Sequence, residues 1–532
     1  MILQKDSRPA VSVLLGIVAL GALLRLYHLA AQALWYDDIT TLAIAAKSLR
    51  FILCQYPAYK PVYIIVLKAW TGIFGIGAVA AKMLPALSGI ASIFLVFLIG
   101  KGICNRRVGL ISAFLLSISC FHIYHSRQIK QYAFLSFLIL LSIFFFIKFI
   151  SERKTRFLAA NALLNIAIIF VHPFGFSLVL VQIAHMLVHQ RLIAKADLKR
   201  WFLAQAPLLC TCGVWCAVML RVQSHLQAVL WWVPRPDTAS LLETFATFCY
   251  GARYGLSDVT VAACPAFIAA AIIAIFGLLF IRGLFVVFKY YPRSHMKICV
   301  IWLFLPVALA FLFSRVFFPV YVVKHLLIAL PAFYYIVAIG LWHNTKASFA
   351  ATILLVIFVL HIVPLGILYG ARAGADWQEA VQLMKKHSLK EDDIIVMATT
   401  KEAVCLIYYL SDADRQALRE VGIFGKLTDK GWQDSFRYRA HEIMTLGSEL
   451  PGKQEACYNP CYHIEADFDS KVLRESFLRT DKRVWLLISK WSGGEYDQEK
   501  IARKLQAYFK MTVQEEAAGV RVYRFEPGMA GT

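Results

Sequence analysis

The chain has 532 residues, 59% of them hydrophobic, and a mean hydropathy of +0.63. These values exclude an ordinary soluble globular protein, whose apolar share lies nearer half. Of 33 acidic and 55 basic residues, 25 and 24 follow position 371, so residues 1–371 carry a net charge of +23 and the remainder −1. The positive charge therefore belongs to the apolar part. It indicates cytoplasmic loops and contacts with anionic ligands rather than nucleic-acid binding, because no basic soluble module with interleaved aromatic residues is present.

Apolar runs of spanning length recur through residues 1–371 and predict about 11 transmembrane helices. The runs are 10–30, 83–100, 108–123, 133–150, 157–171, 173–189, 202–220, 262–281, 298–314, 326–342 and 347–369. Lysine and arginine gather between alternate runs, so the positive-inside rule places these loops and the amino terminus in the cytoplasm. Residues 61–76 are apolar but too short and interrupted to span, which favours an interfacial helix on the outer face.

Residues 372–532 are predicted to form a separate soluble domain outside the cytoplasm. A helix-like stretch begins at Asp376-Trp377, and strand-like apolar runs cover 394–397 and 484–488. This alternation predicts a small α/β domain. Whether Cys457 and Cys461 form a local disulfide is left open by the sequence. No further residues at a spacing typical of zinc ligands accompany them. Acceptor docking, a lid and a spacer all remain open as roles of this domain.

Two adjacent carboxylates, Asp37 and Asp38, follow Trp35-Tyr36 directly after the first apolar run. Acidic groups near a bilayer are costly and usually face a polar path. One acid of such a pair can serve as a general base and the other as an orienting group. The pair can equally stabilise the start of a helix over 40–49, where aspartate is favoured. Composition alone leaves both interpretations open.

The Trp35–Asp38 stretch resembles the W-x-D-E loop after the first helix of bacterial GT-C membrane glycosyltransferases. These belong to the protein mannosyltransferase and lipid A aminoarabinose transferase superfamily (glycosyltransferase family 39-like). Further matches follow in the family's order: Tyr59-Lys60-Pro61-Val62-Tyr63, Lys82 to Gly89, His122 to Tyr132, Val171 to Gly175, Trp231 to Pro234, and Tyr321 to Pro331. Each motif is weak by itself, but six in register across about 300 residues make the resemblance specific.

The resemblance implies a polytopic α-helical GT-C fold and an enzyme of the bacterial inner membrane. Such an enzyme moves a sugar, with inversion, from a polyprenyl-phosphate donor to a lipid, glycan or protein on the outer face. It implies that Asp37 is the general base, that Asp38 supports it, and that no resident cofactor is required; the sequence does not support a divalent metal. The implied substrate-binding residues are Lys60, Arg127 and Lys130 at the phosphate, together with Tyr63, Tyr132, His172, Lys324 and His325.

Three residues depart from the family pattern. Asp38 replaces a glutamate, Gln128 replaces the glutamate of S-R-E-A-R, and Lys130 replaces the second arginine of that motif. Because of these departures, the interpretation that the chain is a non-catalytic GT-C relative, which binds the carrier without turnover, stays open. A transporter or flippase of a lipid-linked sugar is the other alternative, although such proteins carry charged or broken helices near the midplane, ideally in related halves. The sugar, the acceptor and the oligomeric state are not predicted.

Overall fold

The computed structural model describes most of the chain. The residues outside the described set are 1–7, 30, 56–60, 192, 209, 214–232, 253–263, 292–295, 371–375, 391, 398–399, 421–426, 429–430, 433–434, 439–440, 446–481, 490–501, 504, 507–508, 518 and 528–532. The chain divides into two compact units. The first comprises Met1–Leu29, Leu53–Val66 and Lys82–Ala371, and the second comprises Ala30–Ile52, Leu67–Ala81 and Arg372–Thr532.

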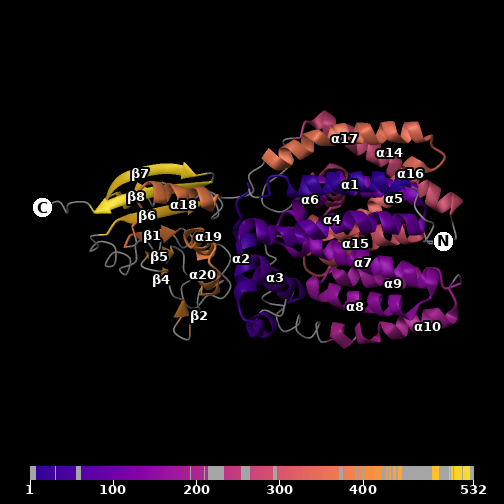
Figure 1. Ribbon diagram of the computed structural model, residues 1–532, viewed down its shortest axis with the longest axis horizontal. Coiled ribbons are helices and arrows are strands. Elements are labelled where there is room, and N and C mark those ends of the chain that lie inside the picture. Colours follow the sequence, from indigo (N-terminus) through magenta and orange to yellow (C-terminus); the bar gives the residue numbers. More distant parts are fainter. Residues whose placement is uncertain are drawn as a thin grey trace. The chain divides into compact units, whose positions relative to one another are not determined.

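The first unit is helical, and its long helices run side by side (Figure 1). Its helices are α1 (Arg8–Leu26), α4 (Ala78–Ile103), α5 (Arg106–Ile118), α6 (Cys120–Ser126), α7 (Gln131–Glu152), α8 (Thr155–Val171), α9 (Gly175–Val188), α10 (Lys195–Ala204), α13 (Thr238–Tyr250), α14 (Ala266–Tyr290), α15 (Lys297–Val316), the 3-10 segment η3 (Val323–Ala329), α16 (Leu330–Trp342) and α17 (Ala347–Gly370). Helix α3 (Pro61–Phe74) contributes to both units.

Six helices in the described part of the chain are long and apolar enough to cross a membrane, and the pair α5–α6, bent by 63°, makes a seventh. Four shorter apolar helices accompany them: 10–26, 61–74, 155–171 and 175–188. The polytopic character predicted from the apolar runs is confirmed. The count of 11 spans stays a prediction, because several predicted runs form helices shorter than a bilayer requires.

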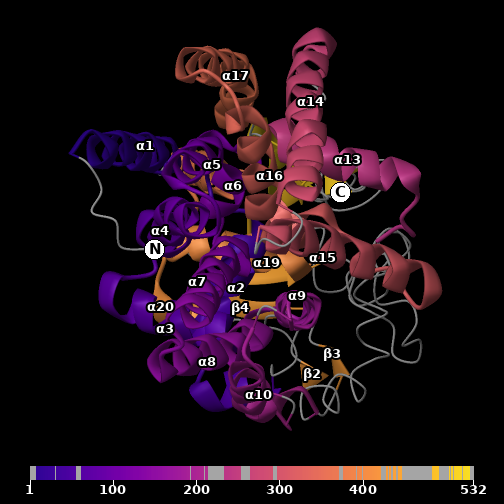
Figure 2. The ribbon, with the colours of Figure 1, turned by 90° about the vertical axis from the view of Figure 1, so that its right-hand side faces the viewer.

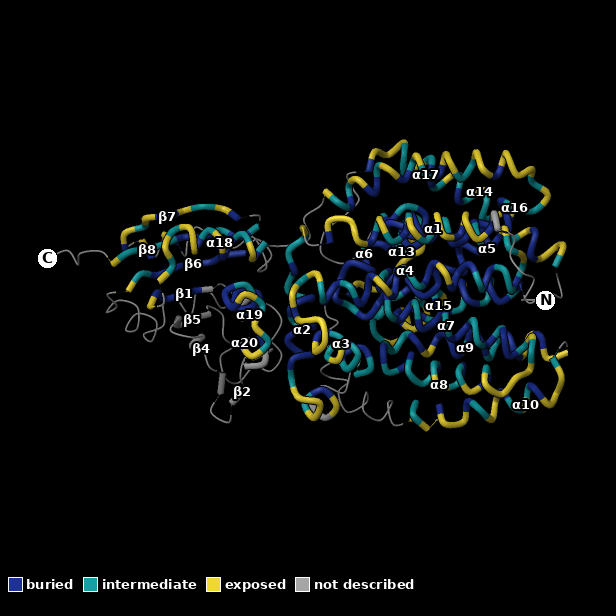
Figure 3. Tube along the Cα trace, in the orientation of Figure 1, coloured by how far each residue is buried: buried dark blue, intermediate teal, exposed yellow. Residues whose placement is uncertain are grey.

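Helix α16 is the centre of the first unit. Its residues from Leu330 to Leu341 are all buried, and it packs against α5, α14, α15 and α17. Figure 2 shows it among these neighbours, whereas Figure 3 shows exposed residues along much of α17. The exposed side chains of α17 include Phe349, Leu355 and Val359. Large apolar residues on such a helix are expected where it faces lipid.

Glycines allow two pairs of helices to approach closely. A Cβ on Gly283 of α14 would clash with the backbone of Ile336 in α16, and one on Gly340 would clash with Leu279. The same holds for Gly100 of α4, whose Cβ would lie 2.7 Å from the Cα of Gly109 in α5. Small residues let helices in a membrane pack by close van der Waals contact, because no hydrophobic driving force operates between helices there.

A network of neutral polar side chains connects α7, α8, α9 and α10. Asn161 donates to the Ser142 carbonyl at 3.1 Å and to Gln182 Oε1 at 3.2 Å, and its Oδ1 accepts from Trp201 Nε1 at 3.1 Å. Asn165 joins the network through Gln182 at 2.9 Å. All these side chains are buried. Because they satisfy one another, the network ties the four helices together without exposing polar atoms to lipid.

The second unit contains α2 (Tyr36–Ala46) and the carboxy-terminal part of the chain. That part has helices α18 (Trp377–Lys386), α19 (Thr400–Leu410) and α20 (Arg415–Glu420) and strands β1 (Ile394–Met397), β2 (Leu427–Thr428), β3 (Gly431–Trp432), β4 (Ser435–Tyr438), β5 (His441–Thr445), β6 (Val484–Ser489), β7 (Phe509–Ala517) and β8 (Val520–Pro527). Six strands form one mixed sheet in the order β4-β5-β1-β6-β8-β7. The two strands predicted from apolar runs, β1 and β6, are parallel neighbours in its centre, with Ile394 opposite Val484. The predicted α/β character is therefore confirmed.

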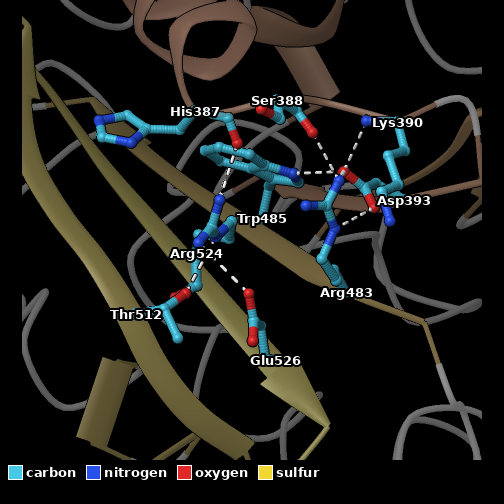
Figure 4. A network of polar contacts seen from close by, with 9 residues as sticks. All are labelled: His387, Ser388, Lys390, Asp393, Arg483, Trp485, Thr512, Arg524 and Glu526. Atoms are coloured by element: carbon cyan, nitrogen blue, oxygen red, sulfur yellow. Dashed lines mark hydrogen bonds and ion pairs between the residues drawn. The ribbon is translucent and has the colours of Figure 1, made fainter.

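A buried carboxylate fastens the turn before β1 to β6 (Figure 4). Asp393 is 1% exposed and accepts hydrogen bonds from Arg483 Nε at 2.9 Å, Trp485 Nε1 at 2.8 Å and the Lys390 N–H at 2.9 Å. Arg483 Nη2 makes a further contact with Asp393 Oδ2 at 2.8 Å and donates to the Ser388 carbonyl. A buried charge is tolerated when it is paired and hydrogen-bonded in this way.

Candidate functional site

Three segments of the first unit meet around the ring of Tyr132, the second residue of α7: helix α6, the end of α8 and the 3-10 segment η3. The ring centroid of Tyr132 lies 5.1 Å from that of His125 and 6.0 Å from those of both His172 and His325. His172 and His325 are themselves 4.7 Å apart, and Phe174 lies 4.9 Å from His325. His125 and His325 are 200 positions apart in the sequence, yet the predicted contacts Tyr132, His172 and His325 form one cluster.

Lys324 brings a cation to the same cluster. Its Nζ lies 5.7 Å from the centroid of the Tyr132 ring, within the range of a cation–π contact. Lys324, His172 and His325 are only partly buried, whereas Tyr132 and His125 are buried. The cluster thus presents a lysine and two imidazoles at a partly open surface. Such donors can hold an anion.

The backbone fixes the tautomer of His172. Its Nδ1 accepts a hydrogen bond of 3.2 Å from the N–H of Phe174 in the turn that connects α8 to α9. In the neutral ring the proton therefore sits on Nε2, which makes this atom a hydrogen-bond donor.

Lys130 and Tyr63 take different places. Lys130 is the partly buried N-cap residue of α7 and adjoins the loop that leads to Tyr132. Tyr63 is fully buried, and its ring lies 5.8 Å from that of Phe134 in α7. Lys130 therefore lies two residues from the centre of the cluster, whereas Tyr63 packs against the helix that carries it.

Arg127 is engaged by the end of helix α1. Its Nη1 donates to the carbonyls of Tyr27 and Arg25, and its Nη2 donates to the carbonyl of His28 at 3.1 Å. Its guanidinium also lies 4.9 Å from the centroid of the Tyr369 ring. The last carbonyls of a helix lack intrahelical partners, and arginine is a suitable partner for them. In the described structure, Arg127 caps α1, and no carboxylate at position 128 is needed to orient it.

Arg25 is an important residue that the sequence reasoning missed. It is fully buried and donates to the carbonyls of Leu116 and Ser117, both at 3.1 Å, at the break between α5 and α6. It also contacts His122 Nδ1 at 2.9 Å. A bend removes regular helical partners from carbonyls in an apolar region, and Arg25 supplies donors to two of them. A lone arginine within an apolar run was the available signal.

Asp37 and Asp38 lie in the first turn of α2, in the second unit. The N-cap residue is Trp35, so neither carboxylate occupies the capping position, although both benefit from the positive end of the helix dipole. Asp38 is 3% exposed, whereas Asp37 is only partly buried. Asp37 is therefore the more accessible of the two acids. The helix expected over 40–49 begins earlier, at Tyr36, and ends at Ala46.

Two lysines donate to backbone carbonyls that lie at or just beyond helix ends. Lys68 donates to the carbonyls of Ala45 at 3.2 Å and Lys47 at 2.8 Å. Lys82 is buried and donates to the carbonyl of Leu29 at 3.3 Å. Helix carbonyls are alternative partners for an ammonium group that would otherwise be exposed.

Some predicted residues lie outside the described residues. They are Lys60, the pair Trp231-Trp232, and Cys457 with Cys461. Within the described part of the chain, no group of three or more His, Cys, Asp or Glu side chains is arranged to hold a metal ion.

Residues 57–221 match the family model described as dolichyl-phosphate-mannose-protein mannosyltransferase. The match includes the motifs from Tyr59 to Gly175, whereas the Trp35–Asp38 loop lies before it. No curated protein sequence matches the chain.

Several solved structures share the fold at low sequence identity. The apo form of ArnT from Cupriavidus metallidurans is 11% identical, with 97% of each chain covered and a TM-score of 0.58. The same protein bound to undecaprenyl phosphate is 10% identical, with 98% of each chain covered and a TM-score of 0.56. The oligosaccharyltransferase AglB from Archaeoglobus fulgidus, in complex with an inhibitory peptide and a dolichol-phosphate, is 12% identical, with 97% of this chain and 74% of that chain covered and a TM-score of 0.51. These matches, together with the family model, confirm the GT-C resemblance indicated by the motifs.

Proposed function

We propose that this chain, whose fold and motifs resemble those of GT-C proteins, is a membrane glycosyltransferase that takes its sugar from a polyprenyl-phosphate donor. The observation that carries the proposal is the convergence of Lys324, His172 and His325 around Tyr132 in a chain of this fold. One structural relative is bound to undecaprenyl phosphate and another to a dolichol-phosphate. A cluster of one cation and two imidazoles suits the phosphate of such a carrier.

In the proposed reaction, the Asp37 carboxylate removes the proton of an acceptor hydroxyl. The hydroxyl oxygen attacks the anomeric carbon from the face opposite the phosphate, and the bond between that carbon and the phosphate oxygen breaks with inversion. Asp37 is suited to this role because it is the more exposed acid of the first turn of α2. Asp38, which is buried, supports the loop. A general base of this kind contributes about 10²- to 10⁴-fold to the rate.

The leaving polyprenyl phosphate gains negative charge as the bond breaks. Lys324 and Lys130 are assigned to this charge, together with Lys60, which lies outside the described residues. His172 contributes the hydrogen-bond donor at Nε2, because its Nδ1 is already an acceptor. Donors in place before the reaction stabilise developing charge without reorganisation. Arg127 is assigned a positioning role through α1, since its terminal nitrogens bond to that helix.

The finer assignments are also part of the proposal. The acceptor is a lipid, glycan or protein on the outer face of a bacterial inner membrane, and the amino terminus is cytoplasmic. The distribution of Lys and Arg in the sequence supports this orientation through the positive-inside rule.

The purified protein tests the proposal with a panel of polyprenyl-phosphate sugars, by measuring both sugar transfer and carrier binding. Asp37→Asn should lower transfer at least about 100-fold, since it removes the base, and should leave carrier binding unchanged. The matched control is Asp412→Asn, because the Asp412 side chain in the same unit is 84% exposed. Transfer by the Asp37 variant at the wild-type rate would refute the assignment. Carrier binding by the wild type without transfer would instead support the non-catalytic alternative.

A further inference from the structure

The acid-bearing helix α2 and the carboxy-terminal domain belong to one compact unit. Residues Ala30–Ile52 cluster with Arg372–Thr532, although most of the apolar helices of the first unit lie between them in the sequence. Helix α2 packs against α19 and α20 of that domain, and its buried face runs from Asp38 through Ala46. The facing helix α19 is buried from Val404 to Tyr408. The domain is therefore part of the surroundings of the acid loop.

One tyrosine of α19 holds the backbone just before the acids. The Tyr409 hydroxyl accepts a hydrogen bond of 2.7 Å from the N–H of Leu34 and donates one of 3.3 Å to the Leu34 carbonyl. Leu34 is fully buried, so water does not replace these bonds readily. Two bonds to the same residue fix the backbone that enters Trp35 and the first turn of α2. Leaving a buried N–H unpaired costs free energy, so the folded state favours keeping the hydrogen bond between the Leu34 N–H and the Tyr409 hydroxyl.

The preceding tyrosine fixes a second segment beside the acids. The Tyr408 hydroxyl donates to the Ile76 carbonyl at 3.1 Å, in the turn between α3 and α4. Burial raises the pKa of Tyr408 far above its usual value, and the nearby Asp38 carboxylate raises it further. The raised pKa favours the protonated form of the Tyr408 hydroxyl, which is the form that donates to the Ile76 carbonyl.

The far end of α2 is held as well. Lys68 of α3 donates to the carbonyls of Ala45 and Lys47, where α2 ends. These are the carbonyls that a helix leaves without intrahelical partners. Helix α2 is thus fixed by Tyr409 at its start and by Lys68 at its end, which restricts both its position and its rotation.

We propose that the carboxy-terminal domain is the scaffold of the acid loop and that Tyr409 is a positioning residue for Asp37. The inference rests on the proposed function, in which Asp37 is the base. It replaces the open roles of spacer, lid and acceptor dock with a definite one: helix α19 sets the position from which the carboxylate meets the acceptor hydroxyl. Misplacing a reacting group by about 1 Å can lower a rate about 100-fold without loss of binding.

The test uses Tyr409→Phe in the full-length protein, which removes one oxygen and keeps the ring. The matched control is Tyr523→Phe, because the buried Tyr523 hydroxyl in the core of the same domain has no hydrogen-bond partner among the described residues. The first measurement is hydrogen–deuterium exchange of the peptide that contains Leu34. Loss of both hydrogen bonds to Leu34 should speed exchange of the Leu34 amide at least about fivefold in Tyr409→Phe, whereas Tyr523→Phe should leave it unchanged. Equal exchange in the wild type and Tyr409→Phe would overturn the inference.

The second measurement is sugar transfer. We expect kcat of Tyr409→Phe to fall roughly ten- to 100-fold while carrier affinity and KM for the donor stay at wild-type values, and Tyr523→Phe to match the wild type. Faster exchange at Leu34 with an unchanged kcat would overturn the positioning role. A parallel loss of carrier affinity would also overturn it, because that pattern indicates a general loss of structure. If the wild type transfers no sugar from any donor, the proposed function fails, and the exchange measurement still decides whether Tyr409 holds the loop.

Discussion

Substitutions of Arg127 can separate two roles of its guanidinium: capping of helix α1 and contact with the phosphate of the carrier. If Arg127 acts as a fork that caps α1, Arg127→Lys should lower the stability of the protein even though the charge is kept. A single ammonium nitrogen cannot occupy the positions of both Nη1 and Nη2, which together reach three carbonyls. Each hydrogen bond to a charged donor is worth about 1.5–3 kcal/mol, and the stack on Tyr369 is worth about 0.5–2 kcal/mol. If lysine keeps one of the three bonds, two are lost, and we expect a loss of at least about 3 kcal/mol.

The assay heats the detergent-purified protein and measures the fraction that remains monodisperse by size-exclusion chromatography, beside carrier binding of the unheated samples. Arg127→Lys and Arg127→Gln should both lose heat stability to a similar extent, and carrier binding should survive in both. Arg156→Lys is the matched control, since Arg156 is exposed and contacts a ring, that of Phe157, at 4.9 Å. The reasoning is refuted if Arg127→Lys behaves as the wild type while Arg127→Gln loses carrier binding, because charge alone would then matter, as in a phosphate contact.

Three further substitutions test the packing. Gly283→Ala should lower the heat stability of the purified protein, because its Cβ has no room against α16; Gly277→Ala in the same helix should not, since the nearest atom there is 4.0 Å away. Asp393→Ala should destabilise the sheet by about 3–5 kcal/mol and speed hydrogen exchange in β1 and β6, whereas Asp412→Ala should leave exchange unchanged. Asn161→Leu should cost about 1–3 kcal/mol by leaving its buried partners unpaired, measured as lower heat stability; full wild-type stability would show that the network is dispensable.

Much of the architecture follows from local patterns along the chain. The apolar runs identify the long helices, since a segment that crosses a bilayer must satisfy its own backbone. The strands β1 and β6 are recognisable because buried parallel strands are continuously apolar. The bend between α5 and α6 was not foreseen. Their combined apolar run looks like one helix, and the buried Arg25, which donates to the Leu116 and Ser117 carbonyls, helps to stabilise the break.

The candidate site likewise has residues that motifs in the sequence identify and contacts that only the structure shows. Motif order supplied Tyr132, His172, Lys324 and His325, and the structure brings them together as a single cluster. The motif could not reveal that Arg127 donates its hydrogen bonds to carbonyls at the end of α1. Backbone carbonyls are present at every residue, so the sequence around position 127 does not indicate which of them it will bind.

The sequence by itself determined the multi-pass membrane character, the α/β character of the carboxy-terminal domain and the presence of an acid pair after the first apolar run, because these depend on composition and short-range pattern. The tertiary structure decided which of the two acids is accessible, which cations are engaged elsewhere, and what holds the acid loop. Tyr409 and Leu34 are 375 positions apart, and their contact depends on two helices packing together. A hydrogen bond across such a separation is fixed by the fold as a whole, so no local pattern around either residue predicts it.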